Sequence, residues 1–164
     1  MEDIKKLLSY EIVDKEDIPN LDLYMDQLLL FIEEKMNTLK RHEEDKTLTK
    51  TMVNNYVKGK VISSPVKKKY NKNQIMKLIM ISQLKNILQL SDLKELCDST
   101  NLEEESLANY YDFYRDEQKR IYTELMNSSK IDIDNKDEII KSIITLSVEA
   151  DIRKRVSEIL IDKL

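Results

Sequence analysis

The sequence contains almost no glycine, proline or cysteine. Of its 164 residues, one is Gly, two are Pro and one is Cys, and Trp is absent. A sheet-rich fold joined by many tight turns needs more Gly and Pro than this, so such folds are excluded. The single cysteine, Cys97, allows no internal disulfide and indicates a reducing, cytoplasmic location. Lys, Glu, Leu and Ile are abundant, and they predict an all-α, mostly helical fold.

The sequence also lacks the residues from which most catalytic and metal sites are built. His42 is the only histidine, and we expect it to be exposed because charged residues surround it in the chain. One His and one Cys far apart do not make a zinc site, and a single Gly excludes the phosphate-binding glycine motifs. No run is long and apolar enough to span a membrane, and the first residues do not follow the order of a signal peptide. We therefore expect no enzyme activity, no cofactor, no metal and no membrane association.

The charges are unevenly distributed along the chain. Residues 46–94 carry eleven Lys and one acidic residue, Asp92, whereas residues 1–45 and 95–164 each carry seven more acidic than basic residues. The overall net charge is only −4. A basic middle between acidic flanks suits a surface that binds a polyanion, because the flanks repel the polyanion and orient it. The alternative is a solvated, lysine-rich helix face.

The first part of the chain predicts one short and one longer helix. Ile4, Leu7 and Leu8 fit a short amphipathic helix within an acidic segment, residues 1–20. Residues 21–39 show helical spacing of apolar residues. The stripe expected to be buried comprises Leu21, Tyr24, Met25, Leu28, Leu29, Ile32 and Met36. Residues 41–46 contain no apolar residue and predict a loop.

A short polar helix is predicted over residues 50–58. Thr49 can cap its first turn, and Gly59 fits a left-handed position just after its end. Met52, Val53, Tyr56 and Val57 can pack inward, which leaves outward Lys50, Thr51, Asn54, Asn55 and Lys58. An outward face without acids tolerates phosphate, and Asn can bind adenine through two hydrogen bonds. The alternative is an ordinary surface helix.

Residues 60–70 predict a minimal β hairpin, or wing. Val61 and Ile62 are β-branched, Ser63-Ser64-Pro65 would turn the chain, and residues 66–70 would form the return strand. Lys67, Lys68 and Lys69 lie together on that strand. A wing of this kind can contact the DNA backbone, where lysine needs no strict geometry. The alternative is a disordered basic loop.

Capping signals predict the remaining helices. Asn71 and Gln74 form a capping box for a helix to about residue 88, and Ser91 would cap a short helix over residues 92–97. The buried stripe of the first of these helices would include Ile75, Leu78, Ile79, Ile81, Ser82, Leu84 and Ile87. A second capping box is read at residues 100–103, and a third begins at Asn135. The two helices that follow these boxes would form a hairpin or pack on another subunit. Their tyrosines are expected in core and interface rather than in a ligand cage.

Residues 54–96 resemble the DNA-binding domain of the MerR family. The matching residues are Tyr56, Gly59, Pro65, Lys69-Tyr70, Asn71 and the run from Ile75 to Leu88. Ser91 and the residues that follow it resemble that family's next short helix. Asn54 stands where the family usually has an arginine that contacts phosphate, and Val57 replaces an acidic residue. The resemblance implies a winged helix-turn-helix that lacks this arginine contact.

The longer span of residues 18–97 is similar to a bacterial domain-of-unknown-function family, DUF1836. Leu23-Tyr24-Met25-Asp26-Gln27, the run from Leu48 to Lys58 and Lys67-Lys68-Lys69-Tyr70 carry this similarity. It covers about half of the chain and implies a regulator without assigned chemistry. We expect a winged helix-turn-helix domain over residues 21–98 and a helical dimerisation or interaction region over residues 99–164.

The sequence as a whole predicts a DNA-binding transcription regulator that acts as a homodimer on double-stranded DNA. Its effector, if it has one, is unknown. The predicted DNA-binding residues are Lys50, Thr51, Asn54, Asn55, Tyr56, Lys58, Lys60, Lys67, Lys68, Lys69 and Tyr70. The alternative is a non-enzymatic helical module whose basic face meets an acidic protein partner and does not read DNA.

Overall fold

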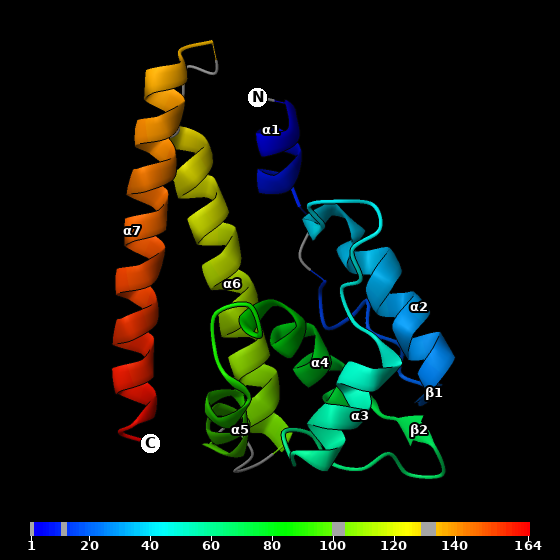
Figure 1. Cartoon of the computed structure of the whole chain (residues 1–164). Coiled ribbons are helices and arrows are strands. Elements are labelled where there is room, and N and C mark those ends of the chain that lie inside the picture. Colours follow the sequence, from blue (N-terminus) through cyan, green and yellow to red (C-terminus); the bar gives the residue numbers. More distant parts are fainter. Residues whose placement is uncertain (1, 11–12, 100–103, 129–133) are drawn as a thin grey trace.

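A computed structural model describes residues 2–10, 13–99, 104–128 and 134–164 (Figure 1). This part of the chain is mostly helical, with one two-stranded sheet. The elements, in chain order, are α1 (Glu2–Leu8), β1 (Leu23–Tyr24), α2 (Met25–Met36), the 3-10 helix η1 (Asn37–Leu39), α3 (Lys50–Lys58), β2 (Lys69–Tyr70), α4 (Lys72–Leu84), α5 (Leu90–Ser99), α6 (Glu104–Ser128) and α7 (Lys136–Ile161). The all-α fold class is therefore confirmed.

The core lies where α2, α3, α4 and α6 meet. Leu28 and Ile32 of α2, Val53 of α3 and Leu78 of α4 are fully buried in it. Tyr111 of α6 is fully buried in the same core, and its hydroxyl donates a hydrogen bond to the Val13 carbonyl over 2.8 Å. Burial of a Leu or Ile side chain contributes about 1.5–3 kcal/mol, so this cluster fixes how α2, α3 and α4 lie relative to one another.

The caps expected for three of the helices are present. Thr49 Oγ1 accepts the Met52 amide over 3.2 Å at the start of α3. Asn71 and Gln74 exchange hydrogen bonds at the start of α4, and Asn135 Oδ1 accepts two amides at the start of α7. The box read at residues 100–103 lies outside the described residues. Each such cap joins residues two or three apart, which is why the sequence alone predicts it.

Several helix boundaries differ from the prediction. The helix expected from residue 21 begins at Met25, because Leu23 and Tyr24 are extended and pair antiparallel with Tyr70 and Lys69. The helix expected to reach residue 88 ends at Leu84, and Lys85 to Leu88 form a turn through amide bonds to Ile81, Gln83 and Leu84 carbonyls. Ile87 is consequently exposed rather than part of the buried stripe, and α5 begins at Leu90, ahead of the expected Ser91 cap.

The predicted left-handed conformation at Gly59 is wrong. Gly59 has φ −77°, and the next residue, Lys60, has φ 59°. A Cβ atom at residue 59 would lie 3.2 Å from the Asn55 carbonyl oxygen and 3.4 Å from Leu90 Cδ2. The 3.2 Å approach to the Asn55 carbonyl oxygen is tighter than an ordinary contact, so the end of α3 itself disfavours a side chain at residue 59, whereas the Leu90 distance is ordinary van der Waals contact.

The predicted wing hairpin is also only partly right. Val61 and Ile62 form no strand, because both of their amides donate to the Tyr56 carbonyl and both side chains are buried. The return strand β2 exists, but its partner is β1, the strand just before α2. The tip of the wing is a separate tight turn at residues 66–69, described below.

Candidate nucleic-acid interface

Helix α3 exposes a face made only of basic, hydroxyl and amide side chains. The hydrophobic side of the helix, including Val53 and Tyr56, packs into the core and fixes its rotation about its own axis. The opposite side is solvent-exposed, as predicted, and consists of Lys50, Thr51, Asn54, Asn55 and Lys58. These side chains donate or accept hydrogen bonds at their tips and include no carboxylate. The face is therefore chemically suited to base edges and phosphates.

A tight turn of lysines, residues 66–69, forms the tip of the wing. Val66 and Lys69 exchange two backbone hydrogen bonds of 3.0 and 2.9 Å across it. The two central residues, Lys67 and Lys68, both have positive φ, 49° and 65°. This is the type I′ pattern, for which Asn-Gly is the favoured pair. We name residues 66–69 the lysine turn.

The left-handed conformation of Lys67 and Lys68 is unfavourable for any residue with a Cβ. The steric cost is about 1 kcal/mol or more for each. Both side chains are exposed, so burial does little to offset this cost. Backbone strain held at exposed charged residues is a feature of functional sites, so the turn is a candidate contact surface in its own right.

The base of the wing is held by Gln74, a buried residue of α4. Its Nε2 donates to the Ser63 carbonyl at 2.8 Å, to Ser63 Oγ at 3.1 Å and to the Ser64 carbonyl at 3.3 Å. Its Oε1 accepts the Asn71 amide at 2.9 Å. One side chain therefore joins the first turn of α4 to the start of the wing. The sequence predicted its hydrogen bond in the cap of α4 but not its hydrogen bonds to the wing.

Lys69 packs against a residue far from it in sequence. Its ammonium lies 4.8 Å from the centroid of the Tyr24 ring, a cation–π contact between the two strands. Such a contact contributes about 0.5–1 kcal/mol at an exposed site. Lys69 therefore stabilises the sheet as well as contributing charge, whereas Lys67 and Lys68 point outward.

The two tyrosines that were predicted to bind DNA, Tyr56 and Tyr70, are buried. Tyr56 and Tyr70 are 7% and 2% exposed, and burial raises the pKa of both hydroxyls. They position α3 and β2 from the core and lie outside the candidate interface. His42 is exposed, as expected, and Cys97 is buried with a thiol pKa raised to about 11 by burial.

Not every lysine of the basic middle is available for a ligand. Lys77 lies in the core, Lys85 Nζ donates to the Thr47 carbonyl over 2.7 Å, and Lys94 pairs with Asp98 at 2.8 Å. Burial lowers the pKa of both Lys77 and Lys85. Apart from Lys46, which precedes α3, the exposed lysines of residues 46–94 lie on α3 and in the wing: Lys50, Lys58, Lys60, Lys67 and Lys68.

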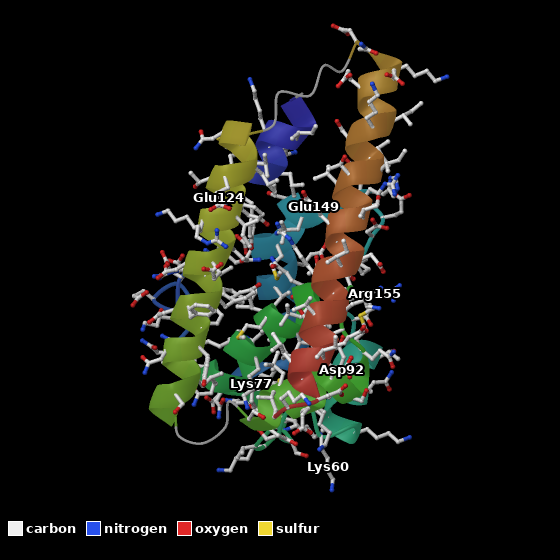
Figure 2. The ribbon with its side chains drawn as sticks, turned by 90° about the vertical axis from the view of Figure 1, so that its left-hand side faces the viewer. Lys60, Lys77, Asp92, Glu124, Glu149 and Arg155 are labelled. Carbon is white, nitrogen blue, oxygen red and sulfur yellow. The ribbon has the colours of Figure 1, made fainter. Side chains whose placement is uncertain are left out.

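Helix α3 and the wing occupy the same end of the molecule, on the side away from α7 (Figure 1). Lys60, at the junction of α3 and the wing, extends away from the body in the perpendicular view (Figure 2).

A family model described as Domain of unknown function (DUF1836) matches residues 13–117, more than half of the chain. The chain belongs to this family. No curated protein and no solved structure matches it.

The DUF1836 match contains the whole candidate interface. It runs from before β1 to within α6, so it includes α3, the wing and the Gln74 anchor. It ends before α7, whose properties therefore belong to this chain rather than to the matched domain. Among the described residues, no three His, Cys, Asp or Glu side chains gather as a metal site, and no helix there is both long and apolar enough to cross a membrane.

Relieving the strain in the lysine turn tests whether the turn geometry is correct. Changing Lys67→Asn together with Lys68→Gly should raise the free energy of unfolding by about 1–2 kcal/mol, because both new residues tolerate positive φ. Urea denaturation followed by circular dichroism measures the change. The matched control replaces both lysines with arginine, which retains charge and strain and should leave stability unchanged. A double variant no more stable than wild type would contradict the turn.

Proposed function

We propose that this protein is a DNA-binding transcription regulator that acts as a homodimer in the cytoplasm. Helix α3 would enter the major groove, with Asn54, Asn55 and Thr51 nearest to the bases. Lys50 and Lys58 at its ends, with the lysines of the wing, would contact the phosphates on either side. In this proposal residues 21–98 form a MerR-like winged helix-turn-helix, and the helices after residue 99 join the two subunits.

The observation that best supports the proposal is the pairing of two features at one end of the fold. An acid-free polar face on α3 lies next to a turn whose lysines are kept in a strained conformation. Either feature alone occurs on ordinary surfaces. Together, at one end of the fold and with Lys60 between them in the chain, they offer several cations at once, which suits a polyanion better than a single charged group.

The proposal is tested by recovering DNA fragments that the protein binds from the genome of its source. Enrichment of a few fragments with a shared sequence is the expected result. Affinity for such a fragment should then fall with salt, with a slope of log K against log salt of about −5 for each bound subunit if six lysines contact phosphate. The absence of enriched fragments, together with a flat salt response, would instead favour an acidic protein as the partner of the basic face.

A further inference from the structure

A polar groove with a volume of 1160 Å³ lies between α1, the C-terminal end of α2 and α6. Helix α1 packs on both α6 and η1, and these contacts set the width of the groove. The three helices meet at the end of the molecule away from α3 and the wing (Figure 1). Sites for small molecules usually have volumes of roughly 300–1,000 Å³, so this groove has room for a ligand larger than a single amino acid.

The charged side chains that line the groove balance in sign. Four are basic and four are acidic. A polyanion such as a nucleotide would meet as many carboxylates as cations there, and the carboxylates would repel it. The balance instead favours a ligand that carries both a positive and a negative group.

Some of these charges already hold the walls of the groove together. Arg115 of α6 pairs with Asp14 at 2.5 Å and with Asp116 at 3.2 Å. Lys35 of α2 lies 3.9 Å from Asp17. These pairs join the segment after α1 to both α6 and α2, so the groove is formed before any ligand enters it.

Three other charged side chains of the groove are exposed and have no ion-pair partner within the described part of the chain. They are Lys6 of α1, Glu34 of α2 and Lys119 of α6. Each comes from a different wall. The two ammonium groups can receive a carboxylate of a ligand, and the Glu34 carboxylate can receive an ammonium group. Hydrogen bonds between such charged groups are about twice as strong as those between neutral groups.

The remaining lining combines aromatic, aliphatic and hydroxyl groups. The rings of Tyr10 and Tyr122 meet edge to face, with their centroids 6.5 Å apart, and Val13 lies in the same lining. Thr38 and Thr123 add hydroxyl groups that both donate and accept hydrogen bonds. Peptide amides can bond to such hydroxyls, while apolar side chains of a peptide can pack on the rings.

We propose that this groove binds a short peptide with free amino and carboxyl ends. The peptide carboxylate pairs with the groove lysines, and its ammonium group pairs with Glu34. In the proposed regulator this peptide is the effector, because α2 carries Glu34 on one side and shares the core with Val53 of α3 on the other. That regulatory consequence rests on the proposed function, whereas the binding itself does not.

Equilibrium dialysis of the full chain tests the site. The probe is an equimolar pool of four-residue peptides with free ends, at about 1 mM in total, and mass spectrometry identifies the peptides that the protein retains. A parallel dialysis uses the same pool with acetylated and amidated ends. Further dialyses use glucose and adenosine triphosphate, which represent a neutral polyol and a polyanion. Titration calorimetry then gives the dissociation constant of a retained peptide.

Two variants of equal net charge separate the groove from the rest of the surface. The first carries Glu34→Gln and Lys119→Gln, which remove one unpaired charge of each sign from the groove. The control carries Glu95→Gln and Lys163→Gln, at exposed positions outside the groove. All four side chains are exposed, so we expect both variants to fold as the wild type does.

We expect the protein to retain a few peptides with free ends and none of the pool with blocked ends. The groove variant should raise the dissociation constant at least about tenfold, and the control should stay within about twofold of wild type. No retained peptide, equal retention of the blocked pool, or equal dissociation constants for the two variants would overturn the proposal. Binding of glucose or adenosine triphosphate in place of peptides would overturn it as well. Because no DNA is used, these outcomes are independent of whether α3 binds DNA.

Discussion

Replacing Lys67, Lys68 and Lys69 with glutamate is expected to lower affinity for duplex DNA on the order of a hundredfold at moderate salt. The change removes three cations from the lysine turn and its return strand and places three carboxylates where phosphates would lie. The slope of log affinity against log salt should become shallower by about three for each subunit. Fluorescence anisotropy of a labelled duplex over a range of salt concentrations measures both quantities.

The control for this prediction carries the same charge change far from the interface. Lys5, Lys136 and Lys163 are exposed and lie outside α3 and the wing, and glutamate at these three positions should alter affinity only slightly. Lys69→Glu also removes the contact with Tyr24, so a Lys67→Glu, Lys68→Glu variant separates lost charge from lost stability. Triple-variant binding equal to that of the control protein would remove the wing from the proposed interface.

Replacing Gln74 with alanine is expected to lower the free energy of unfolding by about 2–3 kcal/mol. The substitution leaves the Asn71 amide without its side-chain acceptor and the Ser63 carbonyl without its donor, beside a side chain only 5% exposed. Four hydrogen bonds made by one side chain are lost together, and each has a net value of roughly 0.5–1.5 kcal/mol. Chemical denaturation measures the change, and trypsin should cleave the loosened wing sooner than in wild type.

Gln27 provides a matched control for this prediction. It occupies the same capping position in α2, where its Oε1 accepts the Tyr24 amide at 3.0 Å, but it is exposed and forms no contact with a distant loop. Gln27→Ala should therefore lower the free energy of unfolding by less than about 1 kcal/mol. Equal losses for the two variants would show that the hydrogen bonds from Gln74 to the wing contribute nothing.

The sequence predicted the candidate interface better than it predicted the elements around it. The outward face of α3 follows from the helical period and from a cap formed by Thr49, both of which are local. The same local reasoning placed a left-handed residue at Gly59 and a strand at residues 61–62, and both predictions were wrong. In both cases carbonyls of α3 accept the amides concerned: the Gly59 amide donates to the Asn55 carbonyl, and the Val61 and Ile62 amides donate to the Tyr56 carbonyl.

Some features of the interface carry no signal in a single sequence. Lysines occupy both central positions of the lysine turn, so it lacks the Asn-Gly pair from which a type I′ turn is usually predicted. The contact between Lys69 and Tyr24 depends on two-residue strands, which are too short to show a period. The burial of Tyr70 follows from the same pairing, so its role changed from surface contact to core residue only when the fold was known.

By itself, the sequence determined the helical class, the caps of α3, α4 and α7, and the concentration of lysine in the middle of the chain. These properties depend on composition or on hydrogen bonds between residues two or three apart. Tertiary structure decided which lysines are available, which strand pairs with the wing, and that α7 remains uncovered along most of its length. Those outcomes depend on which distant surfaces meet, and the free energy of that packing is not encoded in any one stretch of the chain.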